Sequence, residues 1–387
     1  MIKAQTAFTA ELDDPRTAVE EILSQLDLGA LPKNNVGIIS FYQDALETGV
    51  LEAVSKALPF DTVGCTVLAG GTQKELAFEQ VSVTVLSSDD VKFSAAVSGE
   101  ITYENAEEAT RACYRDAFSR LGGETSLALV FGPVTRDISG DRYTLALSEE
   151  SGGAPVFGTL SNTGIVYEDA LVAYNGKAAN RLLSLILVSG DIEFKFYTRA
   201  ISDSNVTRRG AIVTESDGYL LKKINGVSVR DYLLSIGIST GEEGAIASLP
   251  ILVDYKDGTK PAAYSMYGNT DKGMLVGGAV PVGAEIALAD VDYGSVMSTA
   301  EDALDILAAD LDKDGASVAF VIPCFSRCLT LGTQSNDEMD KTAERLGDRV
   351  PYMYMYSGGE ICPVRSSSDG RLVNRFHNMT YTAMTLR

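Results

Sequence analysis

A pattern of local structure that recurs three times along the chain most strongly constrains its fold. Each copy begins with an apolar strand, continues with a capped helix and a strand ending in small residues, and closes with another strand. The copies span residues 36–86, 127–188 and 318–386. Because the pattern rather than the letters recurs and the spacing is irregular, a repeated supersecondary unit is indicated and a solenoid is not.

The stretch from about residue 205 to 295 departs from this pattern and reads as β-hairpins. Lys256-Asp257-Gly258 and Ile224-Asn225-Gly226 are typical hairpin tips. Polar Ser202–Asn205 is the best linker candidate. We therefore predict an α+β protein of two lobes, residues 1–205 and 206–387. Repeated β-α-β-β units form mixed, mainly antiparallel sheets with helices packed outside.

Several helix starts are marked by capping residues. Asp14-Pro15 supplies a cap and a first-turn proline. Ser298 with Glu301, and Ser335 with Glu338, have the spacing of capping boxes. We expect a helix to begin at each of these three places.

The composition excludes several classes of function. The net charge is −21 and no block of lysine or arginine occurs, which opposes binding to nucleic acid or to anionic membranes. The richest apolar run, Leu182–Val188, is far too short to cross a bilayer, and the N-terminus lacks a signal-peptide pattern. The five cysteines, an odd number scattered along the chain, fit reduced thiols. We expect a soluble cytoplasmic protein.

Catalytic signatures are absent from the sequence. It contains no P-loop, no GxGxxG after a strand, no nucleophile elbow, no HExxH and no kinase signature. Its one histidine, His377, excludes schemes that need two. We therefore expect a protein that is not an enzyme.

Two metal-site patterns are incomplete. The run Asp310–Gly315 resembles the start of a calcium loop, but Val321 stands where a bidentate glutamate is required. A turn from helix to strand explains these residues. Cys324 and Cys328 suggest zinc, but their spacing is one residue too long and the other ligands would be isolated. A reactive thiol is an alternative reading of Cys324, because Arg327 would favour a nearby thiolate.

Two further residues have a functional and a structural interpretation. Glu360 follows Tyr356-Ser357-Gly358-Gly359, where glycine lets backbone amides approach a ligand and the carboxylate can accept from an ammonium group. A tight turn with a surface glutamate fits equally well. His377, in an expected strand, is either a hydrogen-bonded structural residue or the single axial ligand of a haem.

In their order and spacing, these motifs resemble the FIST family ("F-box and intracellular signal transduction"). Its N-terminal half is matched by Val63-Gly64-Cys65-Thr66 with Gly70-Gly71 and by Pro155-Val156-Phe157-Gly158. Its C-terminal half is matched by Ile224-Asn225-Gly226 with Tyr232, Pro281-Val282-Gly283, Cys324 with Arg327, Gly359-Glu360 with Pro363, and Arg375–Thr380. One departure is Ala69-Gly70-Gly71, where the family has a glycine-acid step.

The resemblance implies a FIST N-like domain over residues 1–205, a FIST C-like domain over 206–387, and a sensory function in signal transduction. The implied ligand is a small metabolite such as an amino acid, bound between the lobes, and the signal passes to a separate protein such as a kinase or cyclase. Some members bind haem and respond to nitric oxide, which would use His377 here. We predict ligand contacts from six residues, namely Cys65, Thr66, Asn162, Arg327, Glu360 and His377.

In the expected mechanism, Arg327 holds a ligand carboxylate and Glu360 holds an ammonium group. Closure of the cleft then shifts a two-state equilibrium. The alternatives are a haem-based nitric oxide sensor, an enzyme with thiol chemistry at Cys65 or Cys324, and an adaptor that binds no small molecule. No cofactor is expected except in the haem alternative.

Overall fold

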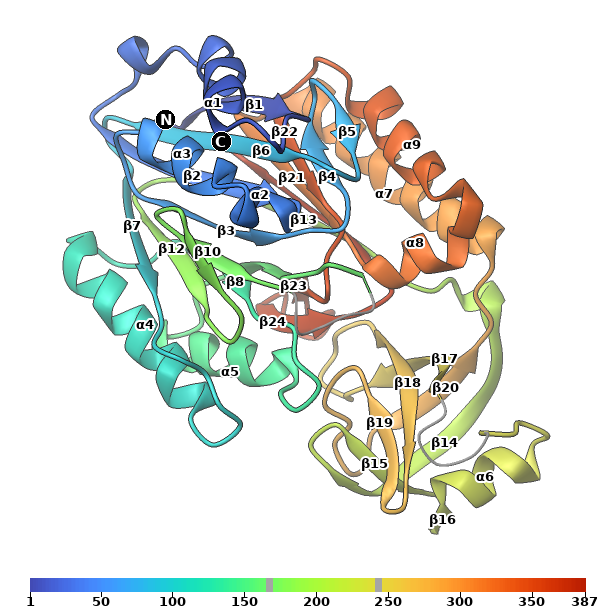
Figure 1. Cartoon of the computed structure of the whole chain (residues 1–387). Helices are drawn as coiled ribbons and strands as arrows, with labels where there is room; N and C mark the ends of the chain where they lie inside the picture. Colours follow the sequence, from blue (N-terminus) through green and yellow to red (C-terminus); the bar gives the residue numbers. More distant parts are fainter. Residues whose placement is uncertain (165–169, 241–245) are drawn as a thin grey trace.

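The computed structural model describes residues 1–164, 170–240 and 246–387. In this part of the chain the strands form three six-stranded sheets and one seven-stranded sheet. Figure 1 shows the three six-stranded sheets together in one body, with the seven-stranded sheet as a smaller lobe beside it. The prediction of mixed, mainly antiparallel sheets in more than one lobe is confirmed.

The threefold repeat is also confirmed. In each copy two parallel strands lie side by side, and a third strand runs antiparallel to the first of them. In chain order, these strands are β2 (Asn34–Phe41), β3 (Thr62–Thr66) and β6 (Val81–Ser88); β8 (Leu127–Gly132), β9 (Val156–Leu160) and β12 (Ser184–Ser189); and β21 (Val318–Pro323), β22 (Tyr352–Met355) and β25 (Tyr381–Leu386).

Each repeat is completed by an outer strand and by a hairpin that joins the sheet of another repeat. The outer strands are β1 (Lys3–Thr9), β7 (Lys92–Val97) and β13 (Phe194–Arg199). The hairpins are β4 (Gly70–Thr72) with β5 (Leu76–Ala77), β10 (Val172–Tyr174) with β11 (Lys177–Ala179), and β23 (Glu360–Arg365) with β24 (Leu372–His377). The first hairpin pairs with β22, the second with β3 and the third with β9, so the three repeats exchange hairpins in a closed circle.

Helices cover the outer faces of the three sheets, as predicted. Each outer face has its own apolar cluster with its helices, and a further cluster lies between the inner faces of the sheets, where Ile38, Phe157 and Phe320 are buried together. The helices are α1 (Pro15–Ser24), α2 (Asp44–Glu47) and α3 (Val50–Ala57); α4 (Ala106–Leu121) and α5 (Gly140–Glu150); and α7 (Tyr293–Asp314), α8 (Phe325–Leu331) and α9 (Asn336–Leu346).

The glycine that precedes the small-residue turn in the first two repeats has a steric cause. A Cβ atom at Gly158 would lie 1.9 Å from the carbonyl oxygen of Val130 on the neighbouring parallel strand. Gly64 meets Ile39 in the same way, at 1.7 Å. Only glycine allows the backbones to approach this closely at these two positions.

The smaller lobe is inserted into the third repeat between β13 and α7. It contains β14 (Val206–Asp217), β15 (Leu220–Ile224), β16 (Val227–Ser228), α6 (Val229–Ser235), β17 (Ile246–Asp254), β18 (Ala262–Thr270), β19 (Gly273–Val276) and β20 (Glu285–Ala289). Pairing of β14 with both β20 and β15 closes the sheet into a small barrel. Both predicted hairpin tips are confirmed, and Asn225 adopts the positive φ of 51° that such a turn requires.

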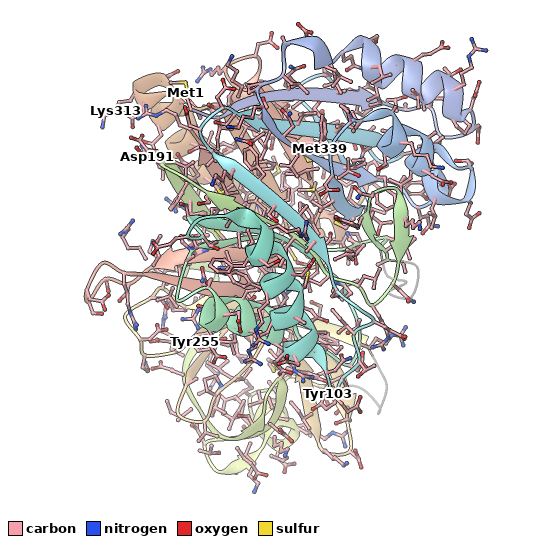
Figure 2. All side chains as sticks on the ribbon, turned by 90° about the vertical axis from the view of Figure 1, so that its left-hand side faces the viewer. Met1, Tyr103, Asp191, Tyr255, Lys313 and Met339 are labelled. Atoms are coloured by element: carbon pink, nitrogen blue, oxygen red, sulfur yellow. The ribbon has the colours of Figure 1, made fainter. Side chains whose placement is uncertain are left out.

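The barrel rests on the connection between β24 and β25. The Tyr264 hydroxyl donates to the Phe376 carbonyl at 2.9 Å, and the Asn378 amide donates to the Ala263 carbonyl at 3.0 Å. Figure 2 labels Tyr255 at this junction, where its hydroxyl lies 2.8 Å from that of Tyr264. In the described part of the chain, the separate lobe thus comprises residues 206–240 and 246–289. Residues 293–387, which the predicted boundary places in the second lobe, complete the three-sheet body.

The capping predictions have mixed outcomes. Asp14 caps α1 with its side chain, as predicted. The capping box predicted at Ser298 is wrong, because α7 begins nearly two turns earlier with a box formed by Asp292 and Ser295. Ser335 does precede α9, but its side chain makes no capping hydrogen bond. Glu338, expected to complete that box, points instead into the core.

Candidate functional site

The three exchanged hairpins cross close to one another at the ends of β3, β9 and β22. Three equivalent backbone hydrogen bonds of 2.9 Å mark the crossing, from Thr66 N to Leu171 O, Leu160 N to Gly359 O, and Tyr356 N to Ala69 O. The small-residue turns of all three repeats therefore meet in the middle of the body. We refer to this place as the strand-end junction.

Thr66 and Asn162 hold this junction together. The Thr66 hydroxyl accepts from the Leu171 backbone amide at 2.9 Å, and the Asn162 backbone amide donates to the Thr66 carbonyl at 2.8 Å. The Asn162 side chain donates to the Tyr356 carbonyl at 3.3 Å and accepts from the Gly164 amide at 2.9 Å. Both predicted residues thus lie at the junction, where their hydrogen bonds join the repeats.

Two glycines bring Glu360 into the junction. A Cβ atom at Gly358 would lie 2.4 Å from the Ser161 carbonyl oxygen, and one at Gly359 would lie 2.5 Å from the Phe376 ring. The chain can pass between its neighbours here only without side chains. The next residue, Glu360, then starts β23 with its side chain completely buried.

The Glu360 carboxyl group is incompletely bonded. Its Oε2 accepts from the Thr380 amide at 3.4 Å, whereas Oε1 has no hydrogen-bond partner. Burial raises the pKa of Glu360 well above its usual value, although the adjoining Cys324 thiol, Ser357 hydroxyl and Arg327 charge act in the opposite direction. A buried acid with an unpartnered oxygen is uncommon in folded proteins and often marks a functional site.

Hydroxyl and thiol groups surround this carboxyl group. The Ser357 hydroxyl lies 2.7 Å from that of Thr159 and accepts from the Gly359 amide at 2.9 Å. The Ser326 hydroxyl donates to the Cys324 sulfur at 3.0 Å. Burial raises the pKa of the Cys324 thiol, and the Glu360 charge raises it further, so the thiol stays protonated.

Arg327 lies one turn beyond Cys324 but binds other protein groups. Its Nε donates to Glu338 Oε1 at 2.8 Å, and its Nη2 contacts the same oxygen at 2.5 Å. Nη1 donates to the Thr299 hydroxyl at 3.0 Å, and Nη2 to the Val296 carbonyl at 2.8 Å. Since Arg327 is 2% and Glu338 0% exposed, they form a buried ion pair that joins α7, α8 and α9.

Cys65 and His377 have neighbours typical of structural residues. Cys65 is fully buried in the central apolar cluster, and burial raises the pKa of its thiol. His377 is 4% exposed, and its Nε2 lies 3.0 Å from the Cys362 carbonyl oxygen. Because a carbonyl only accepts, Nε2 carries the proton, and burial lowers the pKa of His377 to about 4. This hydrogen bond occupies Nε2, so a haem at His377 would have to bind Nδ1 of a ring that is buried inside the protein.

The metal-site patterns are explained by the fold. Asp310 and Asp314 lie in the last turns of α7, and Gly315 ends that helix with a φ of 68°, as the helix-to-strand reading predicts. Across residues 1–164, 170–240 and 246–387, no three His, Cys, Asp or Glu side chains are grouped so that they could hold a metal ion.

The acid at the junction belongs to one repeat. Glu360 pairs with Thr159 at the start of the third hairpin, and Gly70 occupies the corresponding position in the first, paired with Met355. A Cβ at Gly70 would lie 2.8 Å from the Tyr354 carbonyl oxygen and 3.0 Å from the Gln80 side chain, which is fully buried there. The missing acid is thus explained by a backbone carbonyl and a buried amide group that leave no room for a side chain at this position.

Sequence reasoning missed Glu338, Gln80, Ser357 and Thr159 as functional candidates. Ser357 and Thr159 are part of the small-residue turns, so their position in the pattern was a usable signal. The spacing from Ser335 predicts a helix cap for Glu338, and nothing in its local sequence indicates that it binds Arg327 eleven residues earlier.

A surface hollow of about 440 Å³ lies elsewhere, between the end of α7 and β13. Its charged side chains bind one another, since Lys195 bridges Asp310 at 2.8 Å and Asp314 at 2.7 Å. The unsatisfied group in the strand-end junction makes the junction the better candidate site.

Comparison with known proteins supports the family assignment. Residues 35–227 match the FIST N domain, and residues 228–363 match the FIST C domain. Together these matches cover most of the chain, which belongs to the FIST family and has the domain architecture of FIST signalling sensor modules.

Other comparisons add little. A search among curated proteins found no match. Among solved structures, the chain is similar to cyanuric acid hydrolase from A. caulinodans, with 9% identity over 100% of this chain and 99% of that chain and a TM-score of 0.37. Likeness at this level supports no conclusion about function. Of the helices in the described part of the chain, none has the length and apolar character to cross a membrane.

Proposed function

We propose that this chain is a sensor that binds a small metabolite at the strand-end junction and passes the signal to a separate partner protein, such as a kinase or cyclase. One observation carries the proposal, namely that the fully buried Glu360 carboxyl group has an oxygen without a partner. Leaving such an oxygen unpaired destabilises the ligand-free protein, and a ligand donor would remove that penalty.

The ligand class comes from the family and from the chemistry of Glu360. A carboxylate in a site of low polarity binds an ammonium group strongly, which fits an amino-acid-like metabolite. Thr159 and Ser357 add hydroxyl groups within the same cluster. Binding of a ligand carboxylate by Arg327 stays a prediction, and in this structure Glu338 already holds that guanidinium group.

The junction is connected to the helices that would report binding. Cys324 directly precedes α8, and the Tyr356 hydroxyl, at the end of β22, donates to Glu338 Oε2 on α9 at 2.9 Å. A shift of the backbone around Ser357 would therefore reach α8 and α9 through direct contacts. We propose that the partner recognises the changed position of these helices.

We further propose that the site binds without chemical turnover. Burial raises the pKa of Cys65 and of Cys324, so neither thiol is activated as a nucleophile. Because the site residues are buried, ligand entry requires local opening, and association should be slower than diffusion allows.

The test is thermal unfolding of the purified chain against a panel of amino acids and simple primary amines, with the Glu360→Gln variant in parallel. A ligand at 100 times its Kd stabilises the folded state by about 2.7 kcal/mol. We expect saturable stabilisation of the natural chain, weakened at least tenfold in apparent affinity by Glu360→Gln, on the order of 1.4 kcal/mol or more. Equal stabilisation of both proteins would exclude Glu360 as the anchor, and a flat response would remove support for the sensor function.

A further inference from the structure

The charges around Glu360 restrict the chemical class of the ligand more narrowly than membership of the family does. Arg327 is the cation that acts on Glu360, yet its guanidinium group has all three nitrogens bonded within the protein. Its partner Glu338 is fully buried and also accepts from the Tyr356 hydroxyl at 2.9 Å. The ion pair is therefore internally neutralised and has its hydrogen bonds in place.

A ligand carboxylate would have to compete with Glu338 for Arg327. If the ligand carboxylate displaced Glu338 from Arg327, Glu338 would stay buried with only the Tyr356 hydroxyl as its partner. An isolated buried carboxylate is strongly unfavourable. If the ligand carboxylate did not displace Glu338, it would lie beside Glu360, where the two negative charges repel each other. Both outcomes penalise a zwitterion relative to a ligand with only a cationic head.

We propose that the strand-end junction selects a primary alkyl- or arylalkylammonium ligand without a carboxylate, that is, a monoamine rather than an amino acid. The inference rests on the proposed function, because it assumes that the junction is the ligand site. Glu360 Oε1 would accept one ammonium N–H, and the Thr159 hydroxyl oxygen offers a further acceptor in the cluster, because Thr159 acts only as a donor there. The Ser357 hydroxyl already accepts from Thr159 and from the Gly359 amide.

The junction also offers apolar partners for the body of such a ligand. Leu68 and Phe325, both partly buried, lie 3.8 and 4.0 Å from the Cβ position of Gly164. Gly164 in turn holds Asn162 through its amide. Phe325 also lies beside the turn that precedes Glu360, because its amide donates to the Ser357 carbonyl at 2.8 Å. A short hydrocarbon tail on the ammonium group would therefore pack against apolar side chains next to the junction.

Binding should also release a proton. Burial raises the pKa of Glu360, so the free protein holds this group as the neutral acid over a wider pH range than usual. When R–NH₃⁺ binds, the carboxyl O–H bond breaks, the proton leaves to the buffer, and a carboxylate–ammonium pair remains. The number of protons released per ligand should therefore rise as the pH is lowered through the pKa of Glu360 in the free protein.

The experiment compares two sets of three matched compounds, an amine, its amino acid and its acid, by thermal unfolding and calorimetry. One set is butylamine, norvaline and pentanoic acid; the other is phenethylamine, phenylalanine and 3-phenylpropanoic acid. We expect the amine of at least one set to bind at least about tenfold more tightly than its amino acid, and the acid to show no saturable binding. Calorimetry in two buffers of different ionisation enthalpy measures the released proton.

The outcomes separate the two proposals. An amino acid that binds as tightly as its amine, or more tightly, overturns the monoamine proposal and leaves the sensor proposal standing. No saturable binding in either set counts against both. Glu360→Gln should abolish proton release with the amine, whereas Glu344→Gln, an exposed glutamate on α9, should not change it. Amine binding without proton release, or proton release that survives Glu360→Gln, would also overturn the monoamine proposal.

Discussion

The buried pair Arg327–Glu338 gives a sharp test of how the third repeat is held together. Glu338→Gln keeps the shape of the side chain but leaves the guanidinium charge 2% exposed and without its counter-ion. Both contacts to Oε1 lose the charge of their acceptor, while the bonds to Thr299 and Val296 remain. Breaking a buried pair in this way costs about 3–5 kcal/mol of unfolding free energy.

The assay is urea unfolding at fixed temperature and pH, with the slope of the transition checked so that the midpoints can be compared. The double variant Arg327→Met/Glu338→Leu removes both charges and should recover most of the loss, because apolar residues of similar volume replace buried pairs with little change. As a control, Glu20→Gln removes an exposed pair with Arg16 and should change stability by no more than about 0.5 kcal/mol. If Glu338→Gln cost under about 1 kcal/mol, or if the double variant lost as much as the sum of the single ones, the reasoning would be refuted.

Three further predictions concern buried groups. Burial raises the pKa of Glu360, so its contribution to stability is present below the unfolded pKa of about 4.3 and is lost as the pH rises through the folded pKa. Glu360→Gln should therefore flatten the decline of stability above pH of about 4.3 in urea titrations, and an unchanged decline would contradict the assignment. His377 behaves oppositely: with a pKa lowered to about 4, its contribution is present above the unfolded pKa of 6.5 and is lost as the pH falls toward 4. His377→Gln should remove acid sensitivity on the order of 3 kcal/mol between these values, and equal acid sensitivity in both proteins would argue against a buried neutral imidazole. Gly158→Ala places a Cβ against the Val130 carbonyl and should lower the melting temperature sharply, whereas Gly99→Ala, which meets no atom within 4 Å, should leave it nearly unchanged; similar melting temperatures would disprove the close approach.

The sequence predicted part of the structural environment of Glu360. Two glycines before an acid at the end of an apolar strand indicated a close backbone approach, and the structure shows the obstacles as Ser161 and Phe376. The sequence did not predict the complete burial of Glu360, because a turn at the surface can have the same residues. Burial depends on β9, which pairs with β23 although Thr159 and Glu360 are 201 residues apart in the chain.

The sequence by itself determined the repeat, most of its strands and the start of α1, because apolar periodicity and capping act between residues that are close along the chain. It could not determine which sheet each hairpin joins, because strand pairing is non-local and the letters of β4, β10 and β23 do not specify their partners. The exchange of hairpins brings Thr66, Asn162 and Glu360 to one junction. The packing of α9 near α8 places Glu338 where it binds Arg327, so that the guanidinium group contacts protein and not a ligand. Those two outcomes depend on contacts between distant segments, and only the tertiary structure decided them.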